Sequence, residues 1–316
     1  MSKQDKERYT VPRKVQDVIP VRRIWQDGIF LTGNKFSKTY QFSDINYLVA
    51  SREDKESMFL IYSELLNSLD SGAVTKITIN NRRTNKANFE NSILMPMQED
   101  FRDEYRREYN QMLLDKATGA NGITQEKYIT ISVVKKDIEE ARAYFSRVGA
   151  DLISHFAALG SKCVELDASE RLRILHDFYR QGEEAEFSFD LAAMAKRGHD
   201  FKDYICPDSM EKNSDYVKLG DKFCRVLFLK DFASYIKDNM VTELTDFNRN
   251  LMFSIDVVPV PTDEAVREVE NRLLGVETNI TNWQRRQNAN NNFSAVVPYD
   301  MELQRKESKE LSLIHI

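Results

Sequence analysis

The sequence has few of the features that mark disulfide-bonded, secreted or membrane-spanning proteins. Its 316 residues include three cysteines, Cys163, Cys206 and Cys224, which are too few and too far apart for a disulfide framework. The longest stretch without a charged residue, 287–299, is rich in Asn, so no transmembrane helix is expected. Residues 1–8 are charged and lack an apolar core, so no secretory signal is expected. These absences favour the reducing cytoplasm.

The short motifs that accompany common catalytic sites are also missing. The eleven glycines are scattered and form neither the phosphate-binding loop G-x-x-x-x-G-K-[ST] nor G-x-G-x-x-G. No G-x-S-x-G, H-E-x-x-H or C-x-x-C occurs. The sequence therefore predicts no P-loop domain and no catalytic, cofactor-binding or metal-binding residue.

What is present is the composition of a globular protein. Hydrophobic residues make up 41% and charged residues 30%, which is far from the composition of disordered or fibrous chains. Forty-five Lys and Arg against fifty Asp and Glu give a net charge of −5. Because proteins that bind nucleic acid as their main partner are usually basic, we expect no direct DNA binding.

Hydrophobic periodicity and turn residues predict interleaved strands and helices. A β-hairpin is expected at Gly28–Phe42, because Gly33 and Asn34 tolerate a positive φ between two apolar runs. Further strands are expected at residues 73–79, 128–134, 163–166, 223–229 and 251–258, and helices at 51–71, 99–116, 137–159, 167–179, 231–246 and 262–287. Residues 181–220 show only weak periodicity.

This order predicts an α+β fold made of two ferredoxin-like α/β sandwich subdomains with mixed or antiparallel sheets. The loop at 117–125 separates a first subdomain, residues 18–120, from a second, residues 126–300. The polar residues 1–17 are expected to be mobile. Residues 301–310 are charged and begin a further helix.

The last six residues, Leu311–Ile316, do not continue the charged pattern before them. They carry no Asp, Glu, Lys or Arg, and they back-translate to a string that resembles the transposon end used to tag DNA for sequencing. We interpret them as a sequencing-adapter scar rather than a natural apolar tail. On this interpretation the reading frame is cut after Glu310, and the chain is the front of a longer protein.

Most of the polar clusters have structural explanations. In the helix at 99–116, Phe101, Tyr105 and Tyr109 form an apolar stripe opposite a densely charged outer face. His176 and Asp177 are adjacent on a helix and do not face each other, which favours a surface position. A complete enzyme with a dispersed site is the alternative, and its candidate residues are His199, Cys206 and Asp208.

Small basic groups are the candidate contact sites. An ordinary surface position is the simplest explanation for these side chains, and in a chain of net negative charge they suit a partner protein or a lipid headgroup at least as well as DNA. The sequence predicts partner contacts at Arg22, Arg23, Arg82, Arg83 and Lys86.

Several extended segments together carry a resemblance to a known family. They are Arg23–Leu31, Asn88–Pro96, Glu104–Tyr109, Met112–Asn121, Asp151–Phe156, Gly160–Ala168, His176–Arg180 and Asp203–Asp208. The chain resembles the N-terminal region of the conjugative-transfer ATPases of type IV secretion systems, in the branch carried by integrative elements of gut Firmicutes. The resemblance spans most of residues 18–310, and none of its segments is a catalytic signature.

The resemblance implies a function for the whole protein and a narrower one for this chain. The whole protein would be an oligomeric ATPase at the cytoplasmic face of the plasma membrane that energises assembly of a conjugation channel and DNA transfer. ATP and Mg²⁺ would bind a motor domain beyond this chain. The region present here would dock on inner-membrane channel components and contribute to homo-oligomer contacts, with hairpin Gly28–Phe42 and the basic groups as candidate surfaces. The alternatives are a self-standing adaptor protein and the dispersed-site enzyme.

Overall fold

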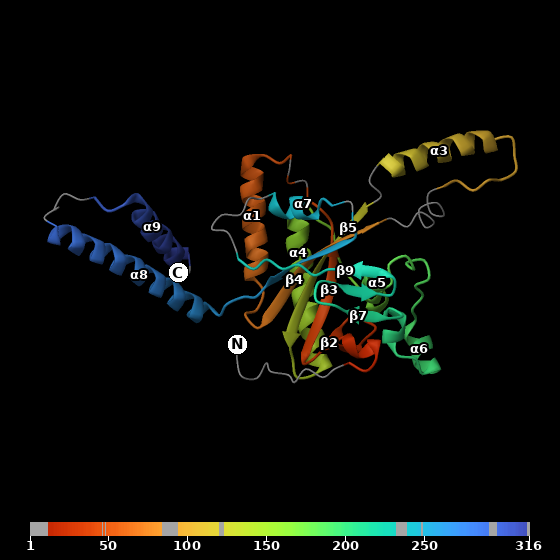
Figure 1. Ribbon diagram of the computed structural model, residues 1–316, viewed down its shortest axis with the longest axis horizontal. Helices are drawn as coiled ribbons and strands as arrows, with labels where there is room; N and C mark the ends of the chain where they lie inside the picture. The colour runs from red at the N-terminus through yellow and green to blue at the C-terminus, as the bar shows by residue number, and fades with distance from the viewer. Residues whose placement is uncertain are drawn as a thin grey trace. The chain divides into compact units, whose positions relative to one another are not determined.

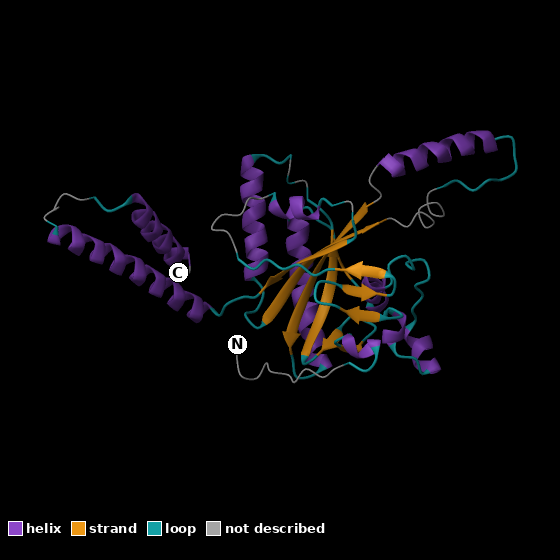
Figure 2. Ribbon diagram, viewed as in Figure 1, coloured by secondary structure: helices purple, strands orange, loops and turns teal. Residues whose placement is uncertain are grey.

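The computed structural model describes residues 12–45, 47, 49–83, 94–119, 123–231, 239–247, 249–290 and 296–314. By its contacts the chain divides into two units, Met1–Val257 and Val258–Ile316. The elements are drawn in Figures 1 and 2. The described part is an α+β structure, as the sequence predicts.

The strands of the first unit form a large and a small sheet. The large sheet contains β1 (Val21–Ile24), β2 (Phe30–Thr32), β3 (Lys35–Phe42), β4 (Ala73–Arg83), β5 (Ile123–Val134), β6 (Cys163–Glu165) and β10 (Leu251–Val257). The small sheet contains β7 (Met210–Lys212), β8 (Val217–Leu219) and β9 (Lys222–Cys224). All pairings in both sheets are antiparallel.

Helices occupy the connections between these strands. The first unit contains α1 (Arg52–Asn67), α3 (Asp103–Gly119), α4 (Ile138–Ala158), α5 (Ala168–Tyr179), α6 (Leu191–Arg197) and α7 (Met240–Thr245), with 3-10 turns η2 (Val15–Val18) and η3 (Phe201–Tyr204). The second unit contains α8 (Thr262–Ala289) and α9 (Tyr299–Ile314), which pack against each other.

Local signals in the sequence place the ends of several helices. The side chain of Ser51 accepts a hydrogen bond from the Asp54 backbone N–H, and Asp137 does the same for Glu140. Asp167 and Glu170 form a reciprocal capping box at the start of α5. These capping contacts satisfy backbone donors that a helix leaves unpaired at its N-terminus.

One face of the large sheet is apolar and carries α1 and α4. Figure 2 shows the two helices on the same side of the strands. Leu65 of α1 and Phe145 of α4 pack with Tyr40, Ile129 and Ile131 of the sheet, and all five are essentially inaccessible to solvent. This layer is the main core, because it removes the most apolar side chains from water.

The opposite face of the sheet is polar, because side chains alternate between the faces of a strand. Cross-strand pairs of polar residues run along it. Thr39 and Thr130 Oγ atoms lie 2.8 Å apart, and Lys76 Nζ lies 3.4 Å from Asp256 Oδ1. Helix α5 lies over one end of this polar face, where the candidate site is found.

A second core joins strands β1 and β2 to α5 and η3. It contains Val21, Phe30, Leu172 and Ile205. Gly28, in the turn between β1 and β2, has a φ of 76°, and a Cβ there would lie 2.0 Å from the Leu166 carbonyl oxygen. The turn therefore requires glycine both for its backbone conformation and for this close approach.

The single large sheet differs from the predicted pair of sandwiches. It combines β1–β4 from predicted subdomain 18–120 with β5, β6 and β10 from predicted subdomain 126–300. The predicted boundary lies in the connection between β4 and β5, which pair along their whole length. The stretch 117–125 resembles a linker in sequence, but residues 117–119 are the end of α3 and residues 123–125 are the start of β5.

Three predicted segments also differ in detail. The strand expected at 223–229 pairs only as β9, and residues 225–230 form an exposed loop that pairs with none of the described strands. The helix expected at 231–246 is present as α7, while residues 232–238 lie outside the described residues. Residues 1–11 of the predicted mobile segment also lie outside them, and η2 gives structure to its end.

Candidate functional site

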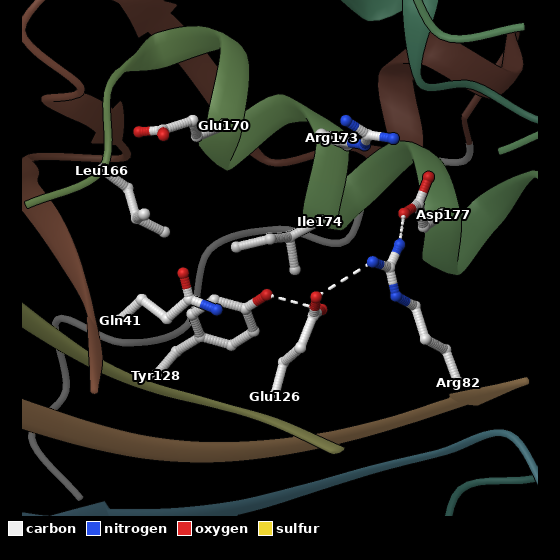
Figure 3. Close-up of a pocket in the computed structure, with 9 residues that line it drawn as sticks. All are labelled: Gln41, Arg82, Glu126, Tyr128, Leu166, Glu170, Arg173, Ile174 and Asp177. Atoms are coloured by element: carbon white, nitrogen blue, oxygen red, sulfur yellow. Dashed lines mark hydrogen bonds and ion pairs between the residues drawn. The ribbon is translucent and has the colours of Figure 1, made fainter. Parts of the chain in front are cut away.

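A cavity of about 220 Å³ lies between α5 and the polar face of the large sheet. Figure 3 shows the side chains that surround it. They come from β3, β4, β5, the loop before α5, and α5 itself: Gln41, Arg82, Glu126, Tyr128, Leu166, Glu170, Arg173, Ile174 and Asp177. Five of these side chains carry formal charge, so the cavity is the main concentration of charge under α5.

Arg82 is the centre of this group. Its Nη2 donates to Glu126 Oε1 on the neighbouring strand at 2.9 Å, and its Nη1 donates to Asp177 on α5 (Figure 3). The guanidinium therefore bridges two carboxylates, one on the sheet and one on the helix. Because Asp177 is buried, this pair is shielded from solvent on the helix side.

Tyr128 completes the network on the sheet. Its hydroxyl donates to Glu126 Oε2 at 2.8 Å. Burial, with a contribution from the neighbouring Glu126 carboxylate, raises the pKa of Tyr128 well above its usual range. The phenol therefore remains protonated and acts as a hydrogen-bond donor, not as a base.

His176 and Asp177 are buried, which corrects the surface position expected from the sequence. They are 4% and 7% exposed, and His176 Nδ1 lies 3.2 Å from Asp177 Oδ1. The His176 ring also packs against Phe187, with centroids 4.9 Å apart. Adjacent helix positions point in different directions. Asp177 faces Arg82 on the sheet, and His176 is covered by the segment around Phe187.

Arg171 fixes the N-terminal end of α5 to the turn between β1 and β2 and to β3. Its Nη1 donates to the carbonyl oxygens of Gly28 at 2.6 Å and Ser37 at 2.7 Å, and its guanidinium lies 4.0 Å from the Phe30 ring centroid. Burial lowers the pKa of Arg171 below its ordinary value. Backbone carbonyls and an aromatic face, instead of a carboxylate, compensate this buried cation.

The chemistry available to the cavity is limited. Glu170 accepts a hydrogen bond from the Asp167 backbone N–H at 2.8 Å. Each of the three carboxylates that line the cavity therefore accepts a hydrogen bond within the fold. None of the described residues that line the cavity is a Ser, Thr or Cys that could act as a nucleophile. Across the described residues, no group of three His, Cys, Asp or Glu side chains could hold a metal ion. The network of Arg82, Glu126, Tyr128 and Asp177 therefore holds α5 against the sheet.

The predicted contact residues are dispersed in the structure. Arg22 and Arg23 are exposed on β1, and the Arg23 guanidinium lies 5.0 Å from the Trp25 ring centroid. Arg82 is half-buried in the network described above. The side chain of Arg83 and the whole of Lys86 lie outside the described residues.

The residues of the dispersed enzyme site expected as an alternative each have their own contacts in the structure. His199 Nδ1 lies 3.9 Å from Asp203 Oδ2, and Asp208 pairs with Arg180 at 3.2 Å. Cys206 is buried, and burial raises the pKa of its thiol to about 11. A nucleophilic cysteine requires a lowered pKa, so the environment of Cys206 has the opposite effect.

The sequence analysis missed Glu126, Tyr128 and the buried role of Asp177. A signal for Tyr128 exists in β5, where Tyr128, Thr130 and Ser132 alternate with Ile129, Ile131 and Val133, whereas Glu126 lies between Gln125 and Lys127. That alternation predicts a polar sheet face. Nothing in the local sequence indicates that α5 covers this face.

The charged face of α3 is exposed, as the sequence predicts, but the apolar stripe is exposed as well. In α3, Tyr105 is 70% exposed and Tyr109 and Met112 are exposed as well, and Phe101, two residues before the helix, is 83% exposed. The side chains that the helix buries are polar: Arg106 Nη1 lies 2.5 Å from Asp100 Oδ1, and the Asn110 side-chain amide pairs with the Met95 backbone. The segment that precedes α3 therefore packs against the polar side of the helix.

A second apolar surface lies in the loop after β9. Val226, Leu227 and Phe228 are each at least 80% exposed, and Leu229 is 57% exposed. Contiguous apolar surface of this kind is uncommon on isolated globular domains and marks interaction sites.

Comparison with known proteins does not assign the chain to a family, since no family model and no curated protein matches it. Among the described residues, none of the helices has the length and apolar character needed to cross a bilayer. The resemblance drawn from the extended segments therefore remains a prediction.

Proposed function

We propose that this chain is the N-terminal, non-catalytic docking and oligomerisation region of a conjugative-transfer ATPase of a type IV secretion system. It would act in the cytoplasm, peripherally at the inner face of the bacterial plasma membrane. Its partners would be inner-membrane components of the conjugation channel. ATP and Mg²⁺ would belong to a motor domain outside this chain, and the chain itself would bind neither.

The exposed apolar side of α3 is the observation that carries the proposal. Tyr105, Tyr109 and Met112 of α3 continue the spacing of Phe101, which lies two residues before the helix, and all four side chains are exposed. Aromatic side chains and Met are enriched at the centres of protein interfaces. Rigid aromatic side chains also bury a large area at a small cost in conformational entropy. A helix that presents them to solvent fits a docking role better than a catalytic one.

We also propose that β3-α1-β4-β5-α4-β6 is a single ferredoxin-like unit. Its support is the order β6-β3-β5-β4, in which all neighbours are antiparallel. The two helices of the unit, α1 and α4, cover the same face. Helix α3 then lies in an excursion between the two central strands β4 and β5, which leaves it available for a partner.

A competition experiment in donor cells tests the docking role. The chain is overproduced in cells that carry an integrative conjugative element with an ATPase of this family, and the transfer frequency is measured. About a tenfold excess of the chain should occupy most docking sites and lower transfer roughly tenfold, by mass action. Undiminished transfer at this excess would contradict the proposal.

Variants of α3 connect the effect to its apolar side. Phe101→Ser with Tyr105→Ser should abolish the inhibition, since both side chains are exposed and contribute little to folding. The matched control is Arg107→Ser with Glu108→Ser, two exposed charged positions on the same helix that leave the net charge unchanged. Equal inhibition by all three proteins would place docking elsewhere.

A further inference from the structure

Helix α8 carries a heptad repeat. Its apolar and core-facing positions follow alternating steps of three and four residues: Val266, Val269, Leu273, Val276, Ile280, Trp283 and Gln287. This spacing is that of the a and d positions of a coiled coil, in which each side chain inserts between four residues of a second helix. Such a strict alternation over three heptads makes a narrow seam suited to one partner helix.

Helix α9 covers this seam incompletely. Ile280 is 5% exposed, whereas the other seam positions are only half-buried. On α9, the positions whose side chains are described and half-buried are Met301, Glu302, Arg305 and Ser308. Among the α9 side chains that the structure describes, Met301 is the one apolar side chain that is half-buried, so these side chains leave most of the seam without an apolar partner.

The charges beside the seam define which helix fits it. With Val266 at position a, the e positions contain Asp263, Glu270 and Glu277, and the g positions contain Arg272 and Arg286. In a parallel pair of identical helices, each g residue faces the e residue of the next heptad on the other helix. Arg272 of each copy then meets Glu277 of the other, which gives two attractive pairs.

An antiparallel pair of identical helices would have the opposite electrostatics. There e residues face e residues and g residues face g residues, so acidic side chains would meet acidic ones and arginines would meet arginines. Arg272 also pairs with Glu268 on its own helix at 2.5 Å. Both side chains of that pair are mainly exposed, so it contributes little and does not hold Arg272 away from a second helix.

We propose that α8 forms a parallel, in-register coiled coil with α8 of a second copy of this chain. The heptad spacing supplies the seam, and the acidic e positions and basic g positions select a parallel copy of the same helix. The half-buried Gln287 at position a adds a polar residue, which favours one register. This inference does not depend on the family assignment, because α8 can dimerise whether or not the chain docks on a conjugation channel.

Light scattering and oxidative cross-linking of the whole chain test the dimer. The mass should rise from one copy to two between about 1 and 100 µM, since dimerisation depends on concentration. Under an oxidant, Leu273→Cys at position a should form a disulfide-linked dimer, because identical a positions face each other in a parallel pair. Leu274→Cys, its exposed neighbour, and the unsubstituted chain are the controls and should not cross-link through α8.

A charge exchange tests the orientation. Glu277→Arg should weaken the dimer about tenfold, since both attractive pairs become repulsive, and adding Arg272→Glu should restore it. Circular dichroism of each variant checks that the chain is folded. A monomer throughout the concentration range, a mass above two copies, or equal cross-linking at residues 273 and 274 would overturn the proposal. So would a double variant no tighter than the single one.

Discussion

Thr75 carries a hydroxyl group inside the main core. It is inaccessible to solvent, and its Oγ1 has no hydrogen-bond partner among the described residues. It faces the apolar layer, where its cross-strand neighbour is Ile131. A buried polar atom without a partner loses its hydration and gains nothing in return, so this hydroxyl destabilises the fold.

Replacement of this hydroxyl by a methyl group should therefore stabilise the protein. Thr75→Val keeps the shape of the side chain and should raise the free energy of unfolding by about 1 kcal/mol, measured from urea denaturation midpoints. Thr39→Val is the matched control on the same sheet. Because Thr39 Oγ1 lies 2.8 Å from Thr130 Oγ1, losing that hydroxyl should destabilise by a similar amount. A lower midpoint for Thr75→Val would show that its hydroxyl is satisfied.

At the scale of elements, α5 is fixed at both ends by arginines. Arg171, one of its own residues, binds the hairpin, and Arg82 reaches it from β4. The helix therefore joins the second core to the polar face of the sheet. This makes its position sensitive to a few polar contacts as well as to apolar burial.

Loss of the Arg171 contacts should destabilise the protein strongly. Arg171→Ala leaves the carbonyls of Gly28 and Ser37 without their side-chain donor and opens a gap beside Phe30. We expect a loss of about 3 kcal/mol in the free energy of unfolding. Arg173→Ala, two residues along the same helix and exposed, should change it by less than about 0.5 kcal/mol. Thermal or urea unfolding measures the stability of both variants. An equal loss of stability in Arg171→Ala and Arg173→Ala would mean that the buried contacts of Arg171 add no stability.

At the scale of the whole molecule, burial shifts many weakly acidic groups in one direction. It raises the pKa of Cys163 and Cys206 to about 11 and that of Tyr144 to about 12, and it raises those of Tyr40 and Tyr128 further. In the unfolded chain these groups lose their protons near their ordinary pKa values of 9.0 and 10.0. Between those values and the raised ones, the folded state binds more protons.

Stability should therefore fall as the pH rises from about 9 to about 11, because the unfolded chain releases protons that the folded chain retains. Arg171, whose pKa is lowered by burial, acts in the opposite sense but is one group among several. Urea midpoints at neutral pH and across this interval measure the effect. Cys206→Ala, which removes one of the shifted groups, should make the decline shallower. A midpoint that is constant or rises with pH would contradict the dominance of these buried groups.

The sequence alone predicts the elements whose signals are local. The hairpin, the strands at β4, β5 and β10, and the helices α4, α5 and α8 follow from periodicity of two or 3.6 residues and from capping residues such as Asp137 and Asp167. These patterns depend on residues close together in the sequence, so they predict an element without knowledge of the rest of the chain. The seam of α8 belongs to the same class, since its heptad spacing and charges lie in one continuous segment.

Only the tertiary structure decided which strands share a sheet and what covers each face of it. β4 and β5 pair across a connection that resembles a domain linker, and α5 brings Asp177 to Arg82 from 95 residues away. The free energy of such contacts depends on burial and partners contributed by distant segments. The same sequence signals therefore allow His176 and Asp177 to lie on the surface or in the interior, and the fold places both inside.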